Sequence, residues 1–110
     1  MAKVYGITPL ELRPGIQGED FEKFFKNEYA PLGLKLGWIG HVLKADRGVR
    51  AGKYAVMWEI PSVELRNRYS PSAGFTEEAL QIIGPGFDAA NGKLNTFVMD
   101  WPGTLYVEIV

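Results

Sequence analysis

The sequence predicts an α+β fold in which two helical segments pack on a four-stranded antiparallel sheet. Residues 37–45, 54–60 and 103–110 are short runs of alternating or aromatic-rich sequence, which is typical of strands. Apolar side chains at spacings of three and four residues indicate a helix over residues 19–29, and glycines and prolines separate these segments. The chain is long enough for one hydrophobic core, so we expect residues 1–110 to form one domain.

The first strand and the first helix follow from local sequence signals. Residues 3–12 alternate weakly between apolar and polar side chains, and Pro9 within them cannot donate to a β-ladder, which favours an edge or a bulge. The helix over residues 19–29 begins with acidic side chains, as the helix dipole favours, and we expect Pro31 and Gly33 to end it.

The next two strands are expected to form a hairpin. The runs at residues 37–45 and 54–60 are joined by the glycine-containing connector 46–52. We take Ala45 to stand opposite Lys53, and this register fixes every other pair in the hairpin.

The second helical segment is predicted to be split. Ser62 can cap a short helix that ends near Tyr69, and Thr76 can open a second piece that runs to about Ile83. Glycine and proline then break the chain again, and residues 87–102 predict a helix end followed by a partly extended crossover.

The end of the chain completes the sheet. Leu105, Val107 and Ile109 alternate with Tyr106 and Glu108 in a clear period of two. The resulting order of elements is β, α, β, β, α, β, which is the ferredoxin-like arrangement.

Both faces of the central hairpin are mainly apolar under the assumed register. One face carries Trp38, Val42, Tyr54, Val56, Trp58 and Ile60, and the other carries Ile39, His41, Leu43, Ala55, Met57 and Glu59. Two helices of this size cover only one face, so the other would remain an exposed apolar patch. We therefore expect a homodimer, with Trp38 and Trp58 at or near the interface between the two sheets.

The composition excludes several classes of function. The chain has 12 basic and 13 acidic residues with no concentrated basic surface, so we expect no nucleic-acid partner. It has no cysteine and one histidine, so we expect no structural zinc and no metal or other cofactor. No apolar run is long enough to span a membrane and no signal peptide is evident, so a cytoplasmic location is expected.

Three segments resemble a known group of proteins. Residues 44–54 (KADRGVRAGKY), 58–60 (WEI) and 62–69 (SVELRNRY) are similar to uncharacterised members of the dimeric α+β barrel superfamily. The resemblance implies a ferredoxin-like fold whose sheets face each other across a dimer. The superfamily includes ring-opening isomerases, cofactor-free monooxygenases, haem-degrading enzymes and stress-response proteins, so the resemblance implies a fold more than an activity.

His41 is the main candidate for chemistry. It is the chain's one histidine, and the assumed register places it opposite Met57 and diagonal to Glu59. An imidazole beside a carboxylate can transfer protons, with Tyr69 as a further candidate catalytic group. The alternative, which the sequence favours, is that His41 and Glu59 form a structural pair.

A cavity between the sheet and the helices is the main candidate for binding. The chain has many large rings around broken helices, and such a layer packs with gaps. The candidate ligand-binding residues are Phe25, Tyr29, His41, Leu43, Met57, Phe75 and Trp101. We expect a binding protein for a fatty-acid-like or polyketide-like molecule, and the alternative is a cofactor-independent isomerase or monooxygenase that uses His41.

Overall fold

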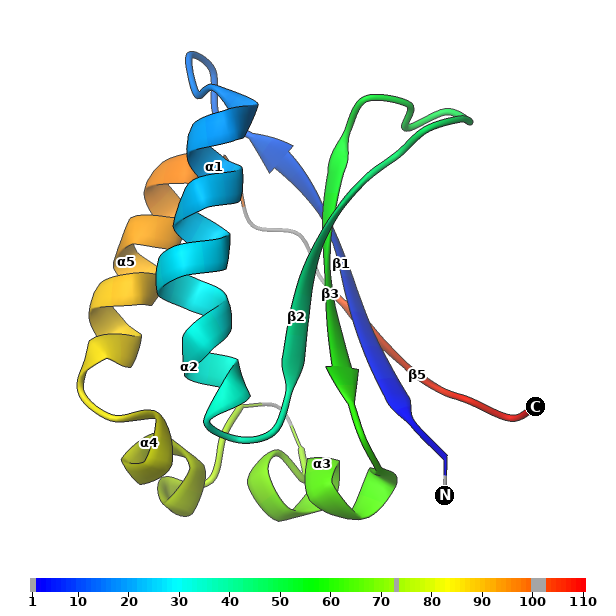
Figure 1. Ribbon diagram of the computed structural model, residues 1–110, viewed down its shortest axis with the longest axis vertical. Helices are drawn as coiled ribbons and strands as arrows, with labels where there is room; N and C mark the ends of the chain where they lie inside the picture. The colour runs from blue at the N-terminus through cyan, green and yellow to red at the C-terminus, as the bar shows by residue number, and fades with distance from the viewer. Residues whose placement is uncertain (1, 73, 100–102) are drawn as a thin grey trace.

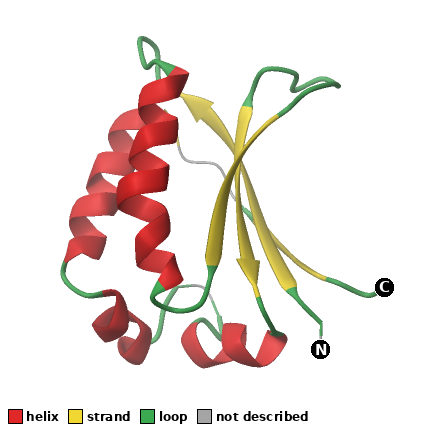
Figure 2. Cartoon of the chain, viewed as in Figure 1, coloured by secondary structure: helices red, strands yellow, loops and turns green. Residues whose placement is uncertain are grey.

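A curled antiparallel sheet with helices on one of its faces makes up the structure (Figures 1 and 2). The computed structural model describes residues 2–72, 74–99 and 103–110. The elements are β1 (Val4–Leu12), α1 (Gly18–Phe24), the π-helical turn η1 (Phe25–Tyr29), α2 (Ala30–Leu34), β2 (Ile39–Lys44), β3 (Tyr54–Ile60), α3 (Val63–Tyr69), α4 (Glu77–Ile83), α5 (Gly86–Phe97), β4 (Val98–Met99) and β5 (Thr104–Val107).

The strand order confirms the predicted ferredoxin-like fold. The sheet runs β2-β3-β1-β4, and β5 also pairs with β1. The strand predicted over residues 103–110 therefore lies at the expected edge of the sheet. Two short strands, β4 and β5, form that edge instead of one. Leu12 pairs with Val98 of β4, and Ile7 pairs with Thr104 of β5.

The first helix does not stop at Pro31, which corrects the prediction. It passes through η1, where the Ala30 N–H donates to the Phe25 carbonyl five residues earlier, and it continues as α2 to Leu34. A proline lacks the N–H of a regular helical turn and its ring clashes with the preceding carbonyl. The wider π turn directly before Pro31 accommodates that proline without breaking the helix.

The second helical segment begins as predicted and then differs. The side-chain oxygen of Ser62 accepts from the Leu65 N–H at the start of α3, and that of Thr76 accepts from the Ala79 N–H at the start of α4. Residues 86–97, however, form the 12-residue helix α5, in place of an extended crossover. Gly84, at a φ of 88°, makes the sharp turn between α4 and α5.

The hairpin register is confirmed. The Ala45 N–H donates to the Lys53 carbonyl at 2.8 Å, and the pairs beyond follow in step. Gly40 stands opposite Trp58, as that register requires, and a Cβ built on Gly40 would lie 2.9 Å from Trp58 Cζ3.

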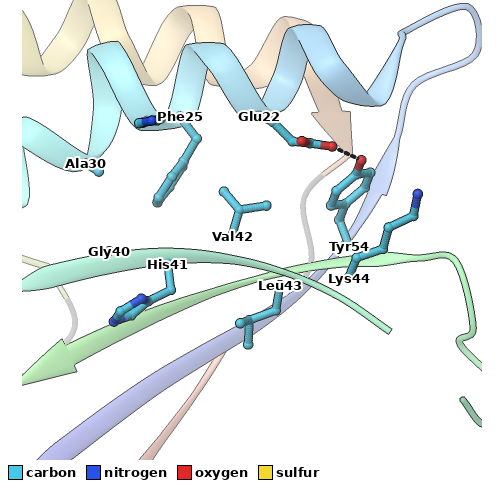
Figure 3. A pocket seen from close by; sticks show the side chains of 10 residues that line it. Glu22, Phe25, Ala30, Gly40, His41, Val42, Leu43, Lys44 and Tyr54 are labelled. Carbon is cyan, nitrogen blue, oxygen red and sulfur yellow. Dashed lines mark hydrogen bonds between the residues drawn. The ribbon is translucent and has the colours of Figure 1, made fainter. Parts of the chain in front are cut away.

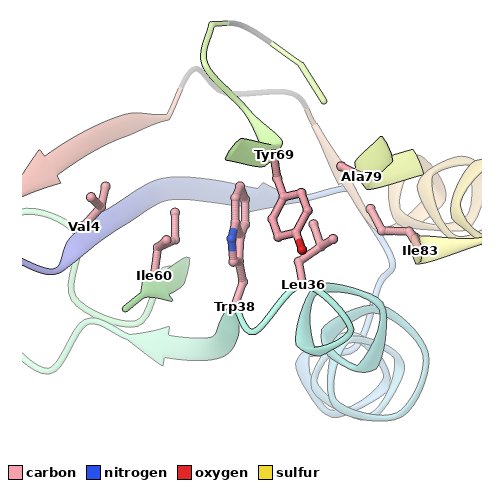
Figure 4. Packing of buried hydrophobic residues seen from close by; sticks show 7 residues of the cluster. All are labelled: Val4, Leu36, Trp38, Ile60, Tyr69, Ala79 and Ile83. Carbon is pink, nitrogen blue, oxygen red and sulfur yellow. The ribbon is translucent and has the colours of Figure 1, made fainter. Parts of the chain in front are cut away.

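The two core clusters lie between the helices and the inner face of the sheet. One contains Val4, Leu36, Trp38, Ile60, Tyr69, Ala79 and Ile83 (Figure 4), and the other contains Leu10, Phe21, Phe24, Phe25, Tyr54, Val56 and Val98. The partly buried Trp58 packs against both clusters. Trp38 and Trp58 thus face the helices of their own chain, so the prediction that they lie at an interface between sheets is wrong.

The outer face of the sheet has no described helix over it (Figure 1). It carries the partly exposed residues Tyr5, Ile7, Pro9, Ala55 and Met57 from β1 and β3. On β2 the exposed fractions are 43% for Ile39 and 40% for Leu43. This face is therefore apolar across three neighbouring strands.

Candidate functional site

An apolar cavity of about 240 Å³ lies between the helices and the inner face of the sheet. Its walls come from seven segments of the chain: Tyr29 of η1, Leu32 and Gly33 of α2, Trp38 before β2, Trp58 of β3, Phe75 before α4, Ile83 of α4 and Phe87 of α5. Five of these eight lining residues are aromatic. The cavity can therefore hold an apolar molecule by shape and dispersion.

The rings of the lining are fixed by contacts with one another. Phe75 lies 5.4 Å from Trp38 and 5.6 Å from Phe87 between ring centroids, and Tyr29 lies 6.2 Å from Trp58. These separations are those of favourable aromatic pairs. The walls are therefore preformed by ring-to-ring packing.

Gly33 brings α2 against the sheet. A Cβ at this position would overlap the six-membered ring of Trp58, so the helix approaches the indole closely because the residue is glycine. Gly40 of β2 also lies against the same ring. Two glycines thus hold the Trp58 ring between a helix and an edge strand.

Few polar groups accompany the cavity. The Tyr29 hydroxyl donates to Asn91 Oδ1 of α5 at 2.6 Å, and burial raises the pKa of this phenol above its ordinary value. Trp38 is 8% exposed, and its Nε1 is buried without a hydrogen-bond partner among the described residues. The ring of Trp38 stands in the cluster of Figure 4, between Ile60 and Tyr69.

A second, larger depression of about 520 Å³ runs along the free edge of β2 (Figure 3). We call it the edge groove, and it is lined by Glu22, Phe25, Lys26, Ala30, Gly40, His41, Val42, Leu43, Lys44 and Tyr54. At one end the Tyr54 hydroxyl donates a very short hydrogen bond to Glu22 Oε2. This bond, helped by burial, raises the pKa of Tyr54 to about 12.

The predicted ligand-binding residues do not form one cavity. Tyr29 and Phe75 line the aromatic cavity, and Phe25 lines the edge groove beside it. His41 and Met57 stand opposite each other on the outer face, since inward-facing Val42 and Val56 alternate with them along their strands.

Two further predicted positions complete this correction. Leu43 lies on the outer face with His41, and both side chains point away from Val42 and Phe25 in Figure 3. Trp101 lies outside the described residues. Leu43 and His41 line the edge groove together with Phe25, so the predicted set divides between two hollows: Tyr29 and Phe75 line the aromatic cavity, and Met57 lines neither.

His41 and Glu59 are in contact, as their diagonal register implies. His41 Nε2 lies 3.3 Å from Glu59 Oε1, and Lys3 Nζ lies 3.0 Å from Glu59 Oε2. The hydrogen bonds from Lys3 and then from His41 lower the pKa of Glu59 below its ordinary value. Tyr69, the third predicted catalytic candidate, lies in the core on the helix side and cannot act with them.

The lining residues that the sequence did not identify are Leu32, Gly33, Trp38, Trp58, Ile83 and Phe87. The register alone identified the Trp58–Gly40 pair, but it did not say which face the helices cover. The signal that could have located the cavity is the large ring facing a bare glycine, because such a pair marks a site where backbone and ring approach closely.

The described part of the chain contains neither a metal-binding cluster nor a membrane-spanning helix. No group of three or more histidine, cysteine or carboxylate side chains within it could hold a metal ion. None of its helices has the length and apolarity needed to cross a bilayer.

Comparison with known proteins identifies the fold. No protein-family model and no curated protein matches the sequence. Among solved structures, the chain is similar to a NIPSNAP family protein from Agrobacterium tumefaciens, with a TM-score of 0.63 at 15% identity over 94% of this chain and 90% of that one. It is also similar to an uncharacterised NIPSNAP-like domain protein from Burkholderia xenovorans, with a TM-score of 0.65 at 13% identity over 97% and 85% of the two chains.

A third similar structure is a dimeric protein of unknown function and ferredoxin-like fold from Bacteroides fragilis. Its TM-score is 0.55 at 15% identity, and the match covers 94% of each chain. At such identities the likeness shows a shared ferredoxin-like fold, and the activity has to be argued from the site.

Proposed function

We propose that the protein is a homodimer in which each subunit binds an apolar small molecule in the aromatic cavity. The observation that carries this proposal is the lining of five rings around about 240 Å³ of space. Apolar cavities in proteins stay dry, and they bind apolar molecules that fill them.

The volume limits the size of the ligand. A dry cavity of about 150 Å³ accommodates benzene, so this one suits a molecule of about ten non-hydrogen atoms. A medium-length alkyl chain and a two-ring polyketide-like fragment both meet this limit. A long fatty acid would exceed it.

The dimer is supported by the apolar outer face. Ile39 and Leu43 are 43% and 40% exposed there, beside Met57 and Ile7 of the adjacent strands. Contiguous apolar patches of this kind are typical of interaction surfaces, and a second copy of the same face would cover this one.

Charge is arranged to suit a two-fold axis. At the hairpin end of the outer face, Lys53 and Arg50 both lie beside Glu11. At the opposite end, Glu59 and Glu108 lie beside Lys3 and Tyr5. Two sheets packed face to face with their strands reversed would bring the basic end of one subunit to the acidic end of the other.

Sedimentation and ligand titration test the two parts separately. Analytical ultracentrifugation at micromolar concentration should show a dimer, and Met57→Glu should give a folded monomer, since it places a charge in the covered face. A wild-type monomer would refute the dimer.

The ligand test uses decanoate and 2-naphthol as probes, followed by isothermal titration calorimetry. We expect saturable binding at about one site per subunit, and weaker binding for Phe75→Asp, which puts a charge in the cavity wall. A flat titration with both probes would refute the binding function. Met57→Glu is the matched control, because Met57 lies across the sheet from the cavity.

A second candidate function rests on the 3.3 Å contact between His41 and Glu59. An imidazole beside a carboxylate can relay a proton in a cofactor-independent isomerase or oxygenase. This pair faces the proposed partner subunit, on the side of the sheet opposite the cavity. If it is catalytic, His41→Ala should abolish turnover of a substrate and leave probe binding in the cavity unchanged.

A further inference from the structure

The indole of Trp58 lies between two hollows of the molecule. One is the aromatic cavity, whose lining includes Trp58 and Gly33, and the other is the edge groove, whose lining includes Gly40 and Phe25. The two linings share no residue. What separates them is therefore a thin layer of side chains between α2 and β2.

The contacts of Trp58 span this layer. On the cavity side its six-membered ring lies against Gly33, and on the groove side a Cβ at Gly40 would lie 2.9 Å from Trp58 Cζ3. The ring also packs against Phe25, with centroids 5.7 Å apart. Phe25 lines the groove, so the indole touches groove-lining residues directly while forming a wall of the cavity.

We propose that Trp58 is the partition that limits the size of the ligand. The inference rests on the proposed binding function and adds the residue that determines its specificity. With the indole in place, the space between the helices and the sheet is about 240 Å³ and does not reach the groove. Without the six-membered ring of the indole, the cavity opens at Gly40 into the edge groove of about 520 Å³. A ligand with a longer alkyl chain can then extend into the groove.

A series of straight-chain alkanoates measures the limit. Each added methylene should tighten binding about fourfold while it is buried, and the gain should stop where the chain no longer fits. For the wild type this break, the chain length at which affinity stops increasing, is expected at about ten carbons. In Trp58→Leu it should move by roughly four carbons or more, because the added groove exceeds the volume of the deleted atoms.

Ile83→Ala is the control for enlarging the cavity alone. Ile83 is 2% exposed and lines the cavity but not the groove, and this change deletes half as many side-chain atoms as Trp58→Leu. It should move the break by about two carbons at most, as expected for enlarging the cavity without opening the groove. If the Trp58→Leu shift is no more than twice the Ile83→Ala shift, the deleted volume alone accounts for it and the inference is overturned.

Two further variants test the partition without relying on Trp58→Leu alone. Trp58→Phe is the milder change and should give a smaller shift in the same direction. Adding Gly40→Val to Trp58→Leu refills the passage from the β2 side and should return the break toward its wild-type position. If the double variant keeps the long limit, Trp58 is not the partition.

The outcomes distinguish the role of Trp58 from the binding function on which that role depends. A wild type that binds no alkanoate of any length contradicts the binding function itself. A wild type with a clear break that Trp58→Leu leaves in place contradicts only the role of Trp58. Thermal melts of each variant at one protein concentration establish that the proteins compared are folded.

Discussion

Substituting Gly33 by alanine should destabilise the protein, although alanine is the better helix former. Gly33 lies in α2, where Gly→Ala alone would stabilise by about 1 kcal/mol. The added methyl group, however, would overlap the ring of Trp58, and overpacking of this kind costs about 1 to 3 kcal/mol. The expected net effect is a loss of up to about 2 kcal/mol.

Gly92→Ala is the matched control. Gly92 lies within α5, and a Cβ there would meet nothing within 4 Å. The same substitution should therefore stabilise by about 0.5 to 1 kcal/mol. Opposite signs for the two variants would show that the helix-to-indole contact, and not helix propensity, decides the result.

Urea unfolding at one fixed protein concentration measures both changes, since a dimer's stability depends on concentration. Trp58→Leu should cost less in the Gly33→Ala background than alone, because it relieves the overlap. If Gly33→Ala stabilises as much as Gly92→Ala, α2 does not approach Trp58 as described.

Three other changes have expected outcomes. Glu59→Gln should lower stability near pH ~7 and lose its effect in acid, because a carboxyl with a lowered folded-state pKa stabilises above its unfolded pKa and not below its folded one; urea midpoints at both pH values check this. Tyr54 has its folded-state pKa raised to about 12, so its bond to Glu22 stabilises below about pH 10 and is lost as the pH rises through 12; the gap between wild type and Tyr54→Phe should shrink over that window. Ser62→Ala and Thr76→Ala should each cost about 1 kcal/mol and add together in the double variant, since each removes an N-cap at a different helix; coupling between them in urea unfolding would contradict independent caps.

Local signals in the sequence were sufficient for the central hairpin. The glycine-containing connector at residues 46–52 and the apolar runs beside it indicated the hairpin, and the structure has Ala45 opposite Lys53, as the assumed register has it. The two N-caps, Ser62 and Thr76, could also be predicted from the sequence, because capping depends on the residue itself and its near neighbours.

The features that could not be predicted from the sequence depend on contacts between distant segments. Pro31 is a helix breaker by itself, and only the π turn before it allows the helix to continue. Both faces of the hairpin are apolar, so periodicity could not say which one the helices cover. For the same reason His41 and Met57 were assigned to a cavity that lies on the other side of the sheet.

The central position of β1 has a consequence for the order of folding. β1 is the first strand along the chain, yet it pairs with β3 on one side and with β4 and β5 on the other. During synthesis it can pair with β3 once the hairpin has emerged, but its second edge stays open until residues 98–107 follow. An open edge is a template for pairing with other chains. Nascent chains stalled before β4 should therefore aggregate or recruit chaperones, although most of the core is already encoded.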